Sequence, residues 1–309
     1  MHALLDVLHT SGFFFRYEVF PLGTDLPEAG HIKYIFFAHP GAIDIYKANH
    51  DVVLMDCTYK TNVYNYPLLN IIGTTGMNTS VQIGLVFLAS EREEDYAWAM
   101  QQFLSLIVEH GIPPPSCFVT DRELALKNAL SATFPEVPQI LCIWHVNKNV
   151  AAHVKRSFPP EIDLERSTPR TRQYKDSEQF NQVMTAYFAI VNATSISEYE
   201  DKLRAMEVID RDTTGYLKLT YLDHWRNGIV KAFTNLVAHF GNTATSRNEG
   251  FHHVLKDYTQ SSKNDVYSLF ERLSNMWVTQ HREHHIAVAQ VQFKIVLCAL
   301  VRCLLNECD

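Results

Sequence analysis

Long apolar runs and cysteines are both scarce in this sequence. No apolar stretch reaches the roughly 18 residues that a membrane span needs, and the N-terminal segment lacks the basic region and long apolar stretch of a signal peptide. The six cysteines lie mostly within apolar segments rather than in loops, a placement typical of buried free thiols in a reducing compartment. We therefore expect an intracellular protein with no membrane partner.

Positive charge is also scarce. Lysine and arginine number 27 against 34 aspartates and glutamates, which gives a formal net charge of −7 at pH 7. A protein that holds nucleic acid by its overall charge is basic, so nucleic-acid contact here must rest on local basic patches or on another segment. What the sequence does have is apolar residues, 47% of 309, enough to bury the core of one large domain or two smaller ones.

The hydrophobic pattern of the first half predicts a mixed sheet flanked by helices. Four strand-like runs separated by short turns indicate an antiparallel meander, over residues 32–37, 52–59, 67–73 and 81–88. A helix over residues 93–110 then ends at a glycine followed by three prolines. A strand, a helix and another strand come next, over residues 117–121, 123–134 and 139–144. Their order requires a parallel crossover, which adds a parallel half to the sheet.

A helical block follows the predicted sheet. Strand signals vanish from about residue 159, and three helices are predicted instead, over residues 178–193, 197–208 and 216–237. The polar stretch 159–176 is the expected exposed entrance to this block. The predicted organisation has four parts: a lead-in helix and strand region at 1–50, a first core part at 51–158, an all-helical insertion at 159–242, and C-terminal helices completing the core at 243–309.

Two aspartates and a distant glutamate are the most informative residues of the chain. Asp56 and Asp121 each end an apolar, β-branched run, and both runs are predicted to be buried strands that carry a carboxylate to the edge of a sheet. Glu249 opens a predicted helix far along the chain. Three acids gathered on such an edge would form a site for hard divalent cations, and such sites support phosphoryl transfer.

Each acid also has a purely structural interpretation. Aspartate often ends a strand as a turn former, which would account for Asp56. Asp121 can cap the helix that follows it. Ser246-Arg-Asn-Glu249 fits a capping box, in which the glutamate folds back onto the backbone at the start of its helix.

Several motifs, each weak alone, occur in an order that is specific as a set. They are Asp56-Cys-Thr-Tyr-Lys-Thr-Asn62, Tyr66-Pro-Leu-Leu69, Glu91 with Trp98, Thr120-Asp-Arg-Glu-Leu-Ala-Leu126, Phe134-Pro135 and Cys142-Ile-Trp-His145. This series resembles the transposase domain of Mutator-like elements, closely over residues 51–150 and more loosely over 247–255. The resemblance implies a ribonuclease H-like α/β fold with a helical insertion before the last acid, and a DDE triad of Asp56, Asp121 and Glu249.

The resemblance also implies a reaction. Two Mg²⁺ or Mn²⁺ ions held by the triad, with Asp56 bridging both, would support DNA strand cleavage and strand transfer without an organic cofactor. The expected partner is DNA, as transposon ends and target, bound by a homo-oligomer in the nucleus. Two alternatives stay open: a domesticated relative that binds DNA as a transcription regulator without cutting it, and a different ribonuclease H-like nuclease that acts on RNA or on junctions.

The Cys142-x-x-His145 element is interpreted as a structural or substrate-contacting part near the acids. A structural zinc site needs four ligands, and Cys142 and His145 supply two. Trp144 has two interpretations, stacking on an unpaired base or packing in the core. His281 and His285, one helical turn apart, are predicted to lie on a solvated helix face.

Four basic residues are candidate DNA contacts, because they are expected to flank the acidic edge or to lie beside Glu249 and could neutralise phosphates: Lys60, Arg122, Lys148 and Arg247. For each of them, ordinary solvated surface charge is the alternative.

Overall fold

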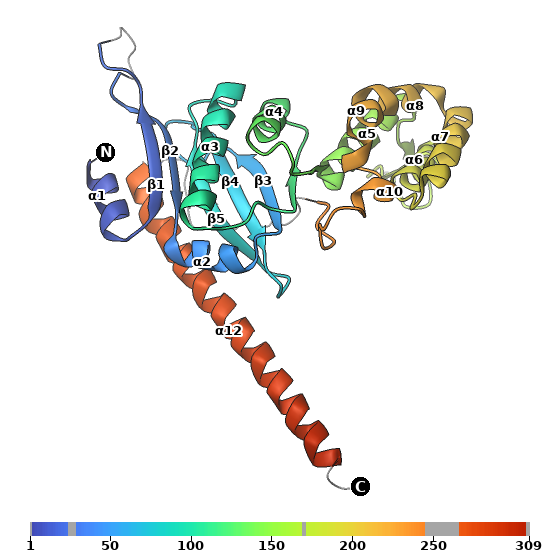
Figure 1. Cartoon of the computed structure of the whole chain (residues 1–309). Coiled ribbons are helices and arrows are strands. Elements are labelled where there is room, and N and C mark those ends of the chain that lie inside the picture. The colour runs from blue at the N-terminus through green and yellow to red at the C-terminus, as the bar shows by residue number, and fades with distance from the viewer. Residues whose placement is uncertain (1, 24–28, 169–170, 245–265, 307–309) are drawn as a thin grey trace. The chain divides into compact units, whose positions relative to one another are not determined.

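Seven strands form one mixed sheet, in the order β1-β2-β5-β4-β3-β6-β7. The structure is a computed structural model that describes residues 2–23, 29–168, 171–244 and 266–306, with the side chains of the last helix described up to residue 294. Strands β1 to β5 pair antiparallel where their registers are given, whereas β6 and β7 run parallel to each other. Helices flank the strands (Figure 1). The architecture confirms the predicted ribonuclease H-like fold class.

The chain divides into two compact units, each described by itself. Unit 1 combines residues 1–115, 124–135 and 247–309, and unit 2 combines residues 116–123 and 136–246. The four-part division made from the sequence stays a prediction.

Unit 1 contains the antiparallel part of the sheet. Its strands are β1 (Phe14–Val19), β2 (Ile32–Ala38), β3 (Val52–Thr58), β4 (Leu68–Thr74) and β5 (Ser80–Phe87). Its helices are α1 (His2–Thr10), α2 (Pro40–Ala48), α3 (Glu93–Glu109), α4 (Leu124–Thr133) and α12 (Val266–Asn306). Nearly every residue of β4 and β5 is buried, because helices cover both faces of these strands.

Opposed residues of β2, β5, β4 and β3 show which helix covers which face. Phe37, Leu85, Asn70 and Asp56 stand in register across the four strands and so share one face. The Phe37 ring contacts Phe270 and Trp277 of α12, so α12 covers this face. In Figure 1, α3 and the first turns of α12 lie on opposite sides of the strands.

The start of α3 is fixed by a buried carboxylate. Asp95 accepts hydrogen bonds from the Tyr34 hydroxyl at 2.5 Å, from the Arg92 backbone N–H at 3.0 Å, and from the Ser90 hydroxyl. Three donors compensate for the burial of this charge. Burial, followed by the hydrogen bond to Asp95, raises the pKa of Tyr34 well above its ordinary value.

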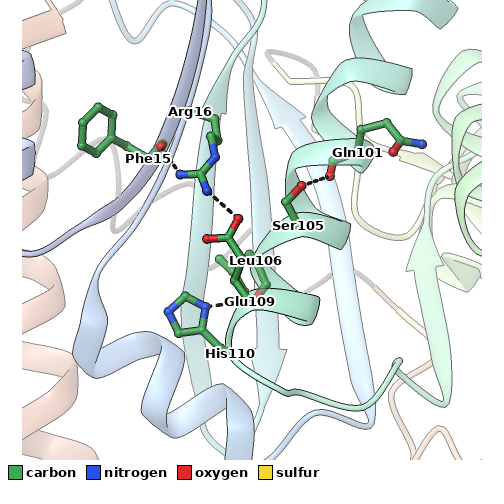
Figure 2. Close-up of polar contacts among 7 residues, drawn as sticks. All are labelled: Phe15, Arg16, Gln101, Ser105, Leu106, Glu109 and His110. Carbon is green, nitrogen blue, oxygen red and sulfur yellow. Dashed lines mark hydrogen bonds and ion pairs between the residues drawn. The ribbon is translucent and has the colours of Figure 1, made fainter.

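The end of α3 is joined to β1 by an ion pair (Figure 2). The Arg16 guanidinium contacts the Glu109 carboxylate at 2.5 Å and also donates to the Phe15 carbonyl at 2.8 Å. His110, directly after the helix, places its Nδ1 atom 2.9 Å from the Leu106 carbonyl. Because both members of the Arg16–Glu109 pair are more than 40% exposed, we expect the pair to stabilise the fold by at most about 1 kcal/mol.

Unit 2 is mostly helical. Its elements are the strands β6 (Cys117–Thr120), β7 (Gln139–Leu141), β8 (Glu161–Ile162) and β9 (Tyr174–Lys175), the helices α5 (Ile143–Ser157), α6 (Glu178–Val191), α7 (Ile196–Ile209), α8 (Arg211–Leu217), α9 (Asp223–Trp225) and α10 (Lys231–Thr234), the π-helix η1 (Lys218–Leu222) and the 3-10 helix η2 (Arg226–Gly228). Val146, Val150 and Val154, one turn apart on α5, are buried in the core of this unit.

Unit 2 corrects three details predicted from the sequence. The predicted strand over 139–144 ends at Leu141, and α5 begins at Ile143. The predicted insertion is not wholly helical, because β8 and β9 pair antiparallel within it. The predicted helix over 216–237 is divided into several short elements. Gly228 explains part of this division: a Cβ atom there would lie 2.6 Å from the Gln139 carbonyl oxygen, so the backbone must pack directly on β7.

The cysteines whose side chains the structure describes are wholly or partly buried. Cys117 and Cys142 are buried and Cys57 is half-buried, and these three cysteines form no disulfide. Within the described part of the chain, every helix is too short or too polar to span a membrane.

Candidate active site

Asp56 lies near the end of β3, at the first half-buried position of the strand. The four preceding residues of the strand are buried, whereas Asp56 is half-buried. The apolar residues Val52 to Met55 hold the strand inside unit 1, so its carboxylate is carried to the rim of the sheet on a rigid element. A rigid strand is a precise support for a catalytic side chain.

The residue opposite Asp56 is Asn70 of β4. This residue was not among the predicted site residues, although the sequence carries one signal for it: Asn70 is the polar residue within the apolar run Leu68-Leu-Asn-Ile-Ile72. Its side chain is fully buried, and neither its Nδ2 nor its Oδ1 atom has a hydrogen-bond partner.

The other face of β3 carries a polar network that is also close to the strand end. The Cys57 Sγ atom lies 3.3 Å from the Tyr96 hydroxyl, which donates to Glu91 at 2.9 Å. The exposed Tyr59 also donates to Glu91, at 2.8 Å. Burial raises the pKa of Cys57 well above its ordinary value, and the charges of Glu91 and Asp56 add to this effect. The thiol is therefore protonated at neutral pH and is no nucleophile.

The loop after β3 presents a basic and an aromatic side chain to solvent. Lys60 is exposed and has a left-handed backbone with φ of 61°. The buried Asn62 organises the loop, because its Oδ1 accepts from the backbone N–H groups of Tyr64 and Tyr66, both at 3.1 Å. The exposed Tyr64 projects from this support. Lys60 therefore stays a candidate DNA contact.

Asp121 directly follows β6 in unit 2. Its Oδ1 atom accepts a 3.1 Å hydrogen bond from the Glu123 backbone N–H. This is a turn-type hydrogen bond from the backbone two residues ahead. Because α4 begins at Leu124, Asp121 lies in the turn before the helix and does not cap it in the predicted way. The backbone just before Asp121 is held by neighbouring β7: the Thr120 carbonyl accepts from the Cys142 N–H at 2.7 Å.

The structure thus brings Asp121 and the Cys142–His145 element together. Thr120 and Leu141 are paired residues at the ends of parallel strands, so Asp121 and Cys142 occupy equivalent places just beyond them. Cys142 is buried, whereas Trp144 is 36% exposed on the first turn of α5. Trp144 is therefore no core tryptophan, which corrects that interpretation and leaves substrate stacking open.

Trp144 lies among polar partners. The Lys148 Nζ atom is 4.9 Å from the centroid of its ring, in cation–π geometry. The His145 ring meets it edge-on, with centroids 4.8 Å apart.

Arg122 is engaged within unit 2. Its Nη1 atom donates to the Thr220 carbonyl at 3.3 Å, and its guanidinium lies 5.4 Å from the centre of the Tyr221 ring. Both partners belong to the π-helix η1, an element that often marks functional positions. Arg122 therefore anchors the segment that carries Asp121, and its contact with DNA stays a prediction.

Two predicted site residues, Glu249 and Arg247, lie outside the described residues, and the mutual geometry of the triad stays a prediction. Among the residues that the structure describes, no group of three or more His, Cys, Asp or Glu side chains is gathered as in a metal site. His281 and His285 place their Nε2 atoms 3.0 Å apart. His285 is exposed as predicted, but His281 is not fully solvated, because its ring packs over Gly41.

The mixed sheet flanked by helices defines a ribonuclease H-like α/β protein, and part of the chain is similar to a known family. Residues 52–149 match the family model of the MULE transposase domain. The predicted resemblance to this family is confirmed over these residues.

Curated relatives include fungal and plant proteins. The chain is 29% identical over 233 residues to the PKS-NRPS hybrid synthetase cheA of Chaetomium globosum, covering 71% of this chain and 5% of that protein. It is 25% identical over 222 residues to Protein FAR1-RELATED SEQUENCE 5 of Arabidopsis thaliana, covering 67% and 27%, respectively. It is 31% identical over 127 residues to Protein FAR1-RELATED SEQUENCE 4 of the same plant, covering 41% and 17%. The chain thus spans only a small part of each of these relatives.

Proposed function

We propose that this chain is the catalytic domain of a DDE transposase, which cleaves DNA and joins the freed end to a target. The observation that carries the proposal is Asp56, placed at the rim of a buried strand within a MULE transposase domain. Asp56, Asp121 and Glu249 would hold two Mg²⁺ or Mn²⁺ ions, for which carboxylate oxygens are suitable ligands. Such ions activate water and stabilise the leaving oxygen of a phosphodiester.

Each part of the chain has a specific task in this reaction. The rigid strands β3 and β6 hold the two aspartates in place, which reduces the entropy lost when substrate and cations assemble. A freed DNA 3′-hydroxyl replaces water as nucleophile in the joining step, so no covalent bond to the protein and no organic cofactor is needed. In this proposal, the protein acts in the nucleus as a homo-oligomer bound to transposon ends and target DNA.

Trp144 and Lys148 supply a contact for single-stranded DNA next to Asp121. A partly exposed aromatic ring can stack on a base, and the ammonium beside it can neutralise a phosphate. This local pair is consistent with an acidic chain that does not bind nucleic acid through its overall charge.

The test is Mn²⁺-dependent nicking of supercoiled DNA by purified Asp56→Asn and Asp121→Asn variants. We expect activity to fall by at least a hundredfold with Tm nearly unchanged, because each change removes negative charge from the cation site and no core contact. The matched control is Asp44→Asn, which alters an exposed aspartate on α2. Wild-type nicking by either site variant would refute the active-site assignment.

A second candidate function is DNA binding without cleavage, as a transcription regulator. It is favoured by the relatives named for a far-red response, including Protein FAR-RED IMPAIRED RESPONSE 1 of Arabidopsis thaliana, 27% identical over 126 residues. A wild-type chain that binds DNA equally well in chelator and in Mn²⁺, and never nicks it, would favour this function over catalysis.

A further inference from the structure

The buried amide of Asn70 lacks the hydrogen bonds that its position requires. The side chain is 0% exposed in the middle of β4, and both its donor and its acceptor atom are without a partner. Leaving a buried polar group unpaired is energetically unfavourable, and folded proteins contain few such groups. An apolar residue of similar size would avoid this cost, so a purely structural asparagine is unfavourable here.

The strand register shows where the amide can find a partner. Asn70 is directly opposite Asp56 on β3 and opposite Leu85 on β5. Opposed residues of antiparallel strands share a face, with Cβ atoms about 4.5–5.5 Å apart. On the β5 side the neighbour is apolar. On the β3 side it is the carboxylate that the proposed reaction requires.

We propose that Asn70 is a positioning residue for a hydrated divalent cation bound at Asp56; this inference rests on the proposed function. An amide offers both a donor and an acceptor. The Nδ2–H group can hold one carboxylate oxygen of Asp56, and the Oδ1 atom can accept a hydrogen bond from a water on the cation. Mg²⁺ and Mn²⁺ suit this arrangement, because Mg²⁺ keeps several of its waters when it binds to proteins and Mn²⁺ takes the same oxygen ligands.

Groups that orient metal ligands contribute measurably to binding. Their removal typically weakens metal affinity or activity by 10- to 100-fold. A structural asparagine behaves differently: replacing it with leucine would remove two unpaired buried atoms and raise Tm, without any change in cation binding. Cation affinity therefore separates the two roles, whereas activity alone does not.

The experiment measures Mn²⁺ dissociation constants by electron paramagnetic resonance of the free ion, together with Tm, for the wild type, Asn70→Leu and Asp56→Asn. The matched control is Leu69→Met, which changes the neighbouring residue on the opposite face of β4 at nearly constant volume. We expect Asn70→Leu to bind Mn²⁺ 10- to 100-fold more weakly with Tm equal to or above that of the wild type, and the control to match the wild type.

Mn²⁺ affinity of Asn70→Leu within twofold of the wild type would overturn the inference. If the leucine variant does not fold, Asn70→Ser decides by the same criterion, since serine is polar but too short to reach across the strands. If Asp56→Asn binds Mn²⁺ as tightly as the wild type, the proposed function itself fails, and the Asn70 inference falls with it. That outcome is distinct from a failure at Asn70 alone, in which Asp56→Asn loses the ion and Asn70→Leu keeps it.

Discussion

The indole N–H of Trp277 donates a 2.7 Å hydrogen bond to the backbone carbonyl of Gln82, 195 residues earlier in the chain. The Gln82 N–H in turn donates to the Gln280 side chain at 3.2 Å. The register between β4 and β5 shifts next to Gln82, as happens at a β-bulge. Helix α12 is therefore hydrogen-bonded to an irregularity in the sheet as well as packed on it.

Trp277→Phe tests this relationship. Phenylalanine keeps most of the buried ring but leaves the Gln82 carbonyl unpaired, so we expect the free energy of unfolding to fall by about 2–4 kcal/mol. Chemical denaturation followed by circular dichroism measures the change. Val278→Ala, at an exposed position on the same helix, should stay within about 0.5 kcal/mol of the wild type. Equal effects at both positions would contradict the prediction.

Glu249→Gln separates capping from catalysis. A capping-box glutamate forms a hydrogen bond that glutamine can also form. If Glu249 is only a cap, the substitution should therefore lower the stability by well under the roughly 1 kcal/mol that a lost cap costs. If Glu249 is instead a cation ligand, the substitution removes the negative charge that helps to hold the ion. We expect a folded variant with nearly unchanged Tm whose Mn²⁺-dependent nicking is reduced by orders of magnitude. Normal nicking by this variant would show that the third acid is another residue.

Trp144→Ala should weaken binding of single-stranded DNA by about tenfold or more, since stacking of one base on an aromatic side chain contributes about 1–3 kcal/mol. Fluorescence anisotropy with a labelled oligonucleotide measures the effect. Tm should change little, because the ring is partly exposed. Leu219→Ala, at a solvent-exposed position in the same unit, serves as the control. Unchanged affinity in the Trp144 variant would exclude a stacking role.

Lys148→Gln tests the charge beside that ring. We expect a loss of DNA affinity that is uniform across sequences. The slope of log affinity against log salt concentration should also decrease in magnitude by about one. An unchanged slope, measured from 50 to 200 mM salt, would mean that the ammonium meets no phosphate.

His39 predicts a loss of stability in mild acid. Its Nδ1 atom accepts the Gly41 N–H at 3.0 Å at the start of α2, and burial, with a smaller effect from His281, lowers its pKa. Below a pH of about 6.5, the pKa of histidine in the unfolded chain, the unfolded chain binds a proton that the native chain does not. Stability is therefore unaffected above that pH and falls as pH decreases below it, by at most about 1.4 kcal/mol per pH unit.

His39→Asn keeps a residue suited to the start of a helix but removes the titration. The decrease in unfolding free energy between pH 7 and pH 5 should therefore be smaller than in the wild type. His239 and His284, whose pKa values burial also lowers, retain their contributions in this variant. An identical pH dependence in both proteins would contradict the prediction.

Strands and long helices of this protein could be predicted because they carry strong periodic signals. The predicted helix at 93–110 and the strands at 52–59 and 81–88 agree with α3, β3 and β5 to within one residue at each end. Helix α5 was not predicted, because the apolar run from Gln139 continues into its first turn, and a short apolar run alone does not distinguish a strand from a buried helix turn. The helical spacing of Val146, Val150 and Val154 was the better signal.

The candidate site was only partly accessible to sequence reasoning. Asp56 and Asp121 stand out because each ends an apolar run, so a one-dimensional pattern exposes them. Asn70 does not, because its relation to Asp56 depends on the register between β3 and β4. Likewise, the exposure of Trp144 depends on where α5 begins rather than on the local composition, which favoured a core position.

The placement of α12 also determines when the protein can finish folding during synthesis. The face of β2 to β5 that carries Phe37 and Asp56 is covered by α12, which begins more than 170 positions after the end of β5. A ribosome must therefore synthesise all of this intervening stretch before the apolar surface is shielded from water. Such delayed pairing exposes nascent chains to aggregation. Chaperone dependence should therefore be greatest while unit 2 is being synthesised, and slower translation of that stretch would lower the yield of native protein.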